Sequence, residues 1–137
     1  MNGQISGGCL CGKVRFSVDN SFERLYLCHC AQCRKITGSA FAANLYTPPE
    51  QLQWTAGEKY IKRFEFPGRD FTKAFCTECG SGLPYLNQKG AAIIIPAGSL
   101  DAEPNIDEQA NIFWAERPRW STSAVDAKYY LQFPDGE

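Results

Sequence analysis

The chain has 137 residues, a length that suits one hydrophobic core, so we expect a single domain over residues 1–137. Hydrophobic residues make up 44% and charged residues 21% of the chain, which excludes a fibrous repeat and argues against disorder. The net charge of −1 disfavours a nucleic-acid partner, because phosphate-binding proteins carry a basic excess. The sequence has neither a bilayer-spanning apolar stretch nor signal-peptide features, so we expect a cytoplasmic protein with no membrane partner.

Short runs of β-branched and aromatic residues recur between Gly, Pro and Asn, which predicts a mainly β fold with little helix. Residues 13–18 alternate polar and apolar side chains, as expected of a half-buried strand. A short helical turn is expected over residues 31–36, before Gly38 stops it. Residues 40–45 are a further candidate strand.

The second half of the chain continues the β pattern. Residues 60–66 alternate less cleanly than the first strand but are predicted to form one. Residues 91–95 are an apolar run that predicts a fully buried strand, ended by Pro96. Candidate strands are also predicted at residues 111–114 and 129–133.

The unusual part of the composition is its seven cysteines and single histidine. In a reducing compartment, clustered cysteines are more often metal ligands or catalytic groups than disulfides, and an odd number fits a disulfide framework poorly. The cysteines form a C-x-C pair, a C-x-C-x-x-C triplet and a C-x-x-C pair: Cys9 and Cys11; Cys28, Cys30 and Cys33; Cys76 and Cys79. These spacings bring two sulfurs to one ion without straining the backbone, so they predict zinc sites.

The simplest partition joins the first and last pairs in one site and leaves the triplet as a second site, although the spacing also permits other partitions. Four thiolates fill the tetrahedral shell of zinc, so the four-cysteine site is expected to be structural. Three thiolates leave one position open, which is the pattern of catalytic zinc. We therefore expect two Zn²⁺ ions per chain, one structural and one catalytic. In the alternative, both clusters are structural, and His29 or an unidentified residue closes the second.

The triplet favours thiol chemistry over hydrolysis. A zinc ion with three thiolates carries a net charge of about −1, which makes it a weak Lewis acid with a preference for soft ligands. His29 lies inside the triplet, where proton transfer or a hydrogen bond to a sulfur is expected; as a fourth ligand it would strain the local geometry. Arg34 and Lys35 follow the triplet and either hold a substrate carboxylate or are exposed bases on a turn.

With these residues in place, the sequence resembles the glutathione-dependent formaldehyde-activating enzyme family, also called the GFA or CENP-V/GFA domain. The resemblance runs through residues 7–16, 28–41 and 75–81, with weaker echoes at 97–101 and 117–120. It implies a β-tent fold of packed antiparallel sheets stapled by zinc. It also implies the partition above, with the two cysteine pairs as structural ligands and the triplet as ligands of the catalytic zinc.

The resemblance further implies a zinc-dependent carbon–sulfur lyase that joins formaldehyde to glutathione as S-hydroxymethylglutathione. The expected partners are thus a small-molecule thiol and an aldehyde, and the expected catalytic residues are Cys28, Cys30, Cys33 and His29. One alternative is a non-catalytic binding module, since a related family of Rab-GTPase chaperones uses a similar zinc-stapled fold. Exposure of Phe113, Trp114 and Trp120 would favour that module. Another is a protein that handles thiols or soft metals. The sequence leaves the oligomeric state open.

Overall fold

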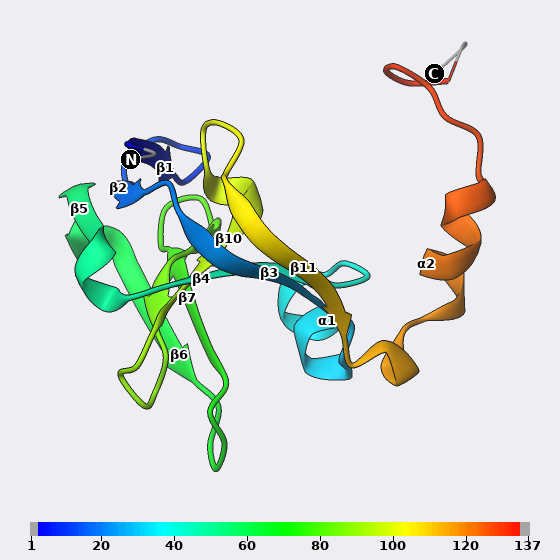
Figure 1. Cartoon of the computed structure of the whole chain (residues 1–137), viewed down its shortest axis with the longest axis horizontal. Coiled ribbons are helices and arrows are strands. Elements are labelled where there is room, and N and C mark those ends of the chain that lie inside the picture. Colours follow the sequence, from blue (N-terminus) through cyan, green and yellow to red (C-terminus); the bar gives the residue numbers. More distant parts are fainter. Residues whose placement is uncertain (1–2, 135–137) are drawn as a thin grey trace.

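The computed structural model describes residues 3–134 (Figure 1). Its strands form three sheets. The first contains β1 (Gln4–Gly8), β2 (Arg15–Asp19) and β5 (Leu52–Ala56). The second, in spatial order, contains β11 (Ile106–Ile112), β3 (Phe22–Cys28), β4 (Ala42–Thr47), β10 (Ile93–Pro96) and β9 (Tyr85–Leu86). The third contains β6 (Ile61–Glu65), β7 (Thr72–Cys76) and β8 (Gly82–Leu83).

The helices are short, as the sequence predicts. They are α1 (Ala31–Thr37) and α2 (Arg119–Ser123), together with 3-10 turns at Pro49–Gln51, Glu58–Tyr60, Ala97–Ser99, Trp114–Glu116 and Ala124–Asp126. Gly38 ends α1 with a φ of 66°, in the left-handed region that glycine adopts without strain. Among residues 3–134, no helix has the length and apolar character needed to cross a membrane.

Among the described strands, pairing is antiparallel with one exception. β3 and β11 pair in parallel, from Ile106 opposite Phe22 to Ile112 opposite Cys28. The expected mainly β fold of packed antiparallel sheets is confirmed, and this edge pair departs from the antiparallel pattern. A parallel pair needs a long crossover between its strands, and here the chain builds four strands of the other sheets before it returns as β11.

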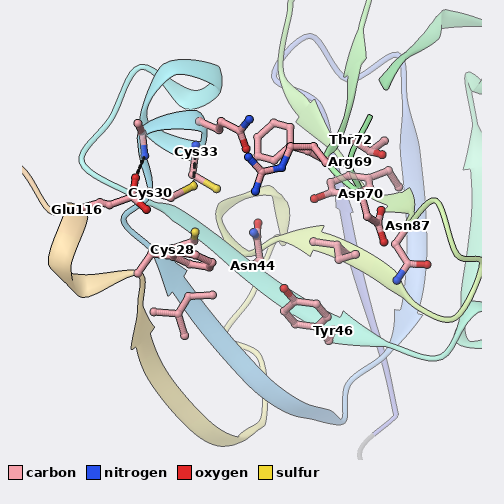
Figure 2. A pocket seen from close by; sticks show the side chains of 17 residues that line it. Cys28, Cys30, Cys33, Asn44, Tyr46, Arg69, Asp70, Thr72, Asn87 and Glu116 are labelled. Carbon is pink, nitrogen blue, oxygen red and sulfur yellow. Dashed lines mark hydrogen bonds between the residues drawn. The ribbon is translucent and has the colours of Figure 1, made fainter. Parts of the chain in front are cut away.

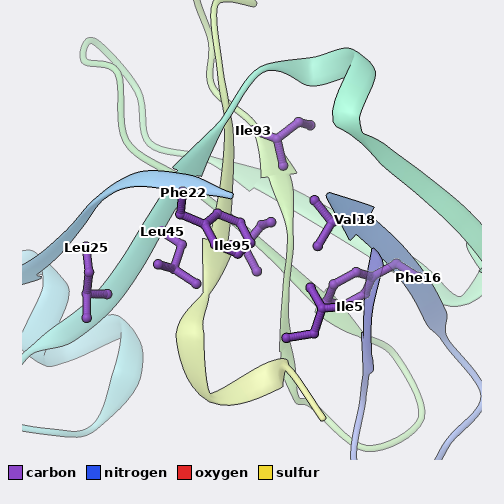
Figure 3. Packing of buried hydrophobic residues seen from close by; sticks show 8 residues of the cluster. All are labelled: Ile5, Phe16, Val18, Phe22, Leu25, Leu45, Ile93 and Ile95. Atoms are coloured by element: carbon purple, nitrogen blue, oxygen red, sulfur yellow. The ribbon is translucent and has the colours of Figure 1, made fainter. Parts of the chain in front are cut away.

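The main core lies between the first and second sheets (Figure 3). Its side chains are Ile5, Phe16, Val18, Phe22, Leu25, Leu45, Ile93 and Ile95. Close approach of the backbone requires Gly7, because a Cβ at this position would lie 2.4 Å from the Phe16 ring and 2.6 Å from the Ser99 carbonyl oxygen. A smaller cluster joins the first and third sheets through Cys9, Val14, Ala74, Cys76 and Leu83.

Four of the predicted strands and the helical turn are confirmed. The alternation of residues 13–18 and 60–66 corresponds to β2 and β6, and residues 40–45 overlap β4. The apolar run at 91–95 corresponds to β10, whose three isoleucines are buried. Pro96 is the last residue of this strand and lies opposite Asn44.

Two predictions near the end of the chain need correction. The strand predicted at 111–114 begins earlier, at Ile106, and ends at Ile112; Phe113 then has a φ of 53° and Trp114 opens a 3-10 turn. The strand predicted at 129–133 is wrong: these residues are exposed and have no regular structure. Their aromatic, β-type composition meets no neighbouring strand in the described chain, and β propensity is realised only on a paired, half-buried surface.

Truncation of a fully buried core side chain tests the packing between the first two sheets. Leu45 is 0% exposed, so we expect Leu45→Ala to lower the free energy of unfolding by about 2 to 5 kcal/mol. Leu10→Ala is the matched control: Leu10 is 90% exposed, and the same deletion there should change stability by less than about 0.5 kcal/mol. Urea unfolding of both variants measures the difference, and equal losses would contradict this core assignment.

Candidate metal centres and the cavity beside them

Four thiols from two distant turns meet beside the smaller core cluster. Cys9 and Cys11 flank the turn after β1, whereas Cys76 ends β7 and Cys79 lies in the turn before β8. Their four Sγ atoms all lie within 4.8 Å of one another. The Sγ atoms of Cys9 and Cys11 are 3.5 Å apart, and those of Cys11 and Cys76 are 3.9 Å apart. A tetrahedral ion with sulfur ligands at about 2.3 Å requires sulfur separations of about 3.8 Å, so the four thiols fit such an ion.

The backbone of both turns points hydrogen-bond donors at these sulfurs. The Val14 N–H donates to the Cys9 Sγ at 3.3 Å, and the Glu78 N–H donates to the Cys76 Sγ at 3.4 Å. Such donors stabilise the thiolate form that a metal ligand needs. The tight turn after Cys76 depends on Gly80, whose N–H donates to the Cys76 carbonyl at 2.7 Å and whose φ is 78°.

Ser81 connects the two turns. Its hydroxyl oxygen accepts a hydrogen bond from the Leu10 N–H at 3.0 Å and lies 3.3 Å from the Cys79 Sγ. Hydrogen bonds from the Ser81 hydroxyl, and then from the backbone of Cys11 and Ser81, lower the pKa of the Cys79 thiol to about 5. These contacts favour the thiolate form that a metal ligand needs.

The other three cysteines form a second cluster where β3 ends and α1 begins. Cys28 is the last residue of β3, Cys30 is the N-cap of α1, and Cys33 lies in its first turn. Their Sγ atoms also lie within 4.8 Å of one another. The Cys30 Sγ accepts a hydrogen bond from the Cys33 N–H at 3.3 Å, so the helix start itself fixes two of the three sulfurs.

Without a cation, the three thiols of this cluster have pKa values shifted in opposite directions. Burial raises the pKa of the Cys33 thiol, and it also raises the pKa of Cys28. Burial acts on Cys30 too, but the hydrogen bond from the Cys33 backbone and the contact with Cys28 outweigh it, so the pKa of Cys30 lies below its ordinary value. A bound dication would remove this difference between the three thiols, because coordination deprotonates thiols outright. The donor set therefore fits a soft or borderline cation such as zinc.

The three-thiol cluster opens onto a cavity of about 490 Å³ (Figure 2). All three cysteines line this cavity, whereas its described lining includes no residue of the four-thiol cluster. The remaining walls come from α1, β4, the β6–β7 turn, the start of β7, β9, β10 and the end of β11. They are Ala31, Gln32, Asn44, Tyr46, Arg69, Asp70, Phe71, Thr72, Tyr85, Asn87, Ile94, Ile112, Phe113 and Glu116.

Tyr46 presents a phenol to the cavity opposite the thiols, and Figure 2 shows its hydroxyl pointing inward. The Arg24 guanidinium lies over the Tyr46 ring, 4.4 Å from its centroid, and Tyr26 packs edge-on against the same ring at 5.4 Å. Burial raises the pKa of Tyr46, so the group is a neutral hydrogen-bond donor at pH 7. Burial raises the pKa of Tyr85 in the same way.

The cavity also contains charged groups that the sequence did not single out. Arg69 extends its guanidinium into the cavity from the β6–β7 turn (Figure 2). Asp70 accepts a hydrogen bond from the Gln88 N–H at 3.0 Å, and Glu116 accepts one from the Ala31 N–H at 3.1 Å. Glu116 thus holds the first residue of α1. These residues come from remote turns, so no local motif reveals them.

His29 is not among the cavity-lining residues. The residue is 4% exposed, and its ring centroid lies 5.1 Å from that of Phe41 and 4.9 Å from that of Trp114. Its Nε2 lies 3.0 Å from the Asn111 Oδ1. Proton transfer by His29 stays a prediction, and the structure instead shows a ring fixed by its neighbours.

Arg34 and Lys35 also lie outside the cavity lining. The Arg34 Nε donates to the His29 carbonyl at 3.3 Å, and both bases border a separate surface hollow beside Trp120. The structure therefore places Arg69, rather than Arg34 or Lys35, as the basic side chain at the cavity wall.

Two compact cysteine clusters lie on a mainly β fold, and each has the ligand atoms close enough together to hold a metal ion; one of them opens to a cavity. Residues 4–116 match the family model described as glutathione-dependent formaldehyde-activating enzyme. The chain belongs to this GFA family. A solved Rhodobacter sphaeroides protein, a structural genomics target, has a similar fold, with a TM-score of 0.59 and 19% identity over 77% of this chain and 100% of that one.

The positive φ of Gly80 provides a test of the turn in the four-thiol cluster. Any side chain in this left-handed conformation is strained, so we expect Gly80→Ala to lower the free energy of unfolding by about 1 to 2 kcal/mol. Gly98→Ala is the control, because Gly98 has an ordinary φ and no atom within 4 Å of an added Cβ. Thermal unfolding of the two metal-loaded variants measures the difference; an unchanged Gly80→Ala protein would argue against this turn geometry.

Proposed function

We propose that this chain is a zinc-dependent carbon–sulfur lyase or synthase that adds a small aldehyde, formaldehyde, to a thiol such as glutathione. The observation that carries the proposal is the three-thiol cluster of Cys28, Cys30 and Cys33 opening onto the cavity. Membership of the GFA family supports the same chemistry. In this proposal the triplet holds the catalytic Zn²⁺, and Cys9, Cys11, Cys76 and Cys79 hold a structural Zn²⁺.

The two clusters differ in what they offer to a substrate. Four thiolates complete a tetrahedral shell, so the four-thiol cluster acts as a clamp between turns. Cys28, Cys30 and Cys33 would hold the catalytic zinc, which would favour the thiolate form of a substrate thiol. The cavity walls then bring the second substrate to that sulfur, and the gain comes from holding the two reactants together.

The reaction is an addition in which no atom is lost. A sulfur electron pair forms the new C–S bond to the aldehyde carbon, and the carbonyl π pair moves to oxygen. Tyr46 donates a hydrogen bond to this developing oxyanion, which takes up the proton that the substrate thiol has lost and becomes the hydroxyl of the product. Arg69 binds a carboxylate of the thiol substrate from the opposite wall. The reverse sequence is the lyase direction.

His29 acts on the site by holding the segment between Cys28 and Cys30. Its backbone N–H donates to the Ile112 carbonyl at 3.0 Å, and its ring is held by Asn111 and two aromatic neighbours. These contacts fix the spacing of the first two thiols of the triplet. We assign His29 a positioning role next to the catalytic cysteines.

A second candidate function is a zinc-stabilised binding module. The observation that favours it is the exposure of Phe113 and Trp114, which follow β11, and of Trp120 in α2. Exposed aromatic side chains of this kind mark interaction surfaces. This candidate needs no substrate in the cavity, so it predicts a protein that binds two metal ions but does not accelerate thiol–aldehyde addition.

Metal counting on two variants separates the roles of the clusters. We expect two zinc ions in the native chain and one in Cys30→Ser, which stays folded because the four-thiol clamp is intact. Cys76→Ser should unfold, since structural zinc contributes on the order of 10 to 16 kcal/mol, comparable with the net stability of a domain. Elemental analysis and circular dichroism report both outcomes. A folded Cys76→Ser protein, or an unfolded Cys30→Ser protein, would contradict the assignment.

Substitution of Tyr46 tests the proposed chemistry. We expect Tyr46→Phe to lower kcat by about 100-fold, the usual loss when one oxyanion donor is removed. Tyr26→Phe is the matched control, because Tyr26 packs on the same ring but does not line the cavity. NMR exchange measurements with glutathione and formaldehyde give the catalysed rate above background. Absence of catalysis by the native chain would favour the binding module, whereas full activity of Tyr46→Phe would remove only Tyr46 from the mechanism.

A further inference from the structure

The end of the described chain carries a dense group of exposed apolar side chains. We call residues 127–134 the C-terminal segment; they follow the last 3-10 turn and have no regular structure. Within it, Tyr129, Tyr130, Leu131 and Phe133 are between 50% and 106% exposed. One exposed apolar residue needs no explanation, but four within five positions form a patch of the kind that marks an interaction surface.

This segment leads away from the body of its own chain. Figure 1 shows it continuing from α2 toward the C-terminus, on the side of α1 opposite to β6. It also lies beyond residues 4–116, which match the family. The residues that build the sheets and both thiol clusters therefore do not include it.

A complementary surface lies beside β6. Ala31, Gln32, Lys35, Ile36, Phe64, Phe66 and Phe71 line an apolar groove of about 420 Å³, which we call the β6 groove. Phe64 and Phe66 are exposed there. β6 is an edge strand of the third sheet, so an extended segment can lie along it without displacing another strand.

We propose that the C-terminal segment of one copy of this chain docks in the β6 groove of a second copy, and the reverse, to form a two-fold dimer. Each copy then supplies one apolar segment and one apolar groove, and reciprocal exchange satisfies all four surfaces in a closed assembly. A fold-back onto its own groove would require the segment to reverse its course around α1.

The area available is sufficient for a stable dimer. Aromatic side chains bury roughly 150 to 250 Å² each when fully covered. Burial of half the exposed surface of the four side chains in each segment, with the groove surface they cover, removes on the order of 1,300 Å² over the two contacts. Specific complexes begin at about 1,200 Å².

The docked segment also borders the thiol cavity. Ala31, Gln32 and Phe71 line both the β6 groove and the cavity, so the two hollows share one wall. The partner's C-terminal segment thus lies beside the cavity wall of the first copy. The docking requires no metal chemistry and is independent of the proposed activity.

Sedimentation equilibrium of the full metal-loaded chain tests the dimer. We expect the native chain to be dimeric at micromolar concentration, and two double variants to be monomeric: Leu131→Ser with Phe133→Ser in the segment, and Phe64→Ser with Phe66→Ser in the groove. Leu86→Ser is the control, since this partly exposed side chain lies outside both surfaces, and it should stay dimeric. Circular dichroism and zinc content verify that every variant is folded.

Mixing the two double variants gives the decisive measurement. A segment-variant chain retains its groove and a groove-variant chain retains its segment, so the mixture should recover a weak heterodimer held by one intact contact. Monomeric native protein would overturn the proposal, and so would a dimer that both double variants preserve. A dimer lost in only one double variant, or a folded mixture that stays monomeric, would also overturn it, because reciprocal docking requires both surfaces.

Discussion

The convergence of four thiols from two turns is the constraint on which the rest of the structure depends. Cys11 and Cys76 are 65 positions apart in sequence, yet their sulfurs lie 3.9 Å apart. This contact joins the turn after β1 in the first sheet to the end of β7 in the third. The small cluster of buried residues around it is too limited to hold two sheets firmly, so the thiols supply what apolar area alone does not.

Strand β7 connects the four-thiol cluster to the cavity. β7 begins at Thr72, which lines the cavity, and ends at Cys76, which belongs to the four-thiol cluster. Ala74 and Cys76 are buried, so the strand cannot shift without opening the core beneath it. The β6–β7 turn that carries Arg69 is therefore anchored at the closed cluster. The four-thiol cluster in this way anchors one wall of the cavity.

Local sequence patterns predicted the parts of the site that are local. The triplet forms at one strand end and one helix start, so its spacing and the stop at Gly38 contain most of its geometry. The grouping of the two cysteine pairs was the simplest choice but needed the family resemblance to become definite. Tyr46 and Arg69 were missed because strand pairing and a remote turn bring them to the thiols, and neither residue stands in a recognisable motif.

The mistaken strand at 129–133 has a different cause. Its aromatic composition is typical of residues that pack on a half-buried surface, and in the described chain no such surface lies beside it. Natural sequences seldom keep a local preference that the whole fold contradicts, because such conflicts weaken the native state. The conflict disappears if the preference is met by another molecule. Residues 129–133 and the apolar groove beside β6 are then the two surfaces of one interface. Within a single copy of the chain both surfaces stay uncovered.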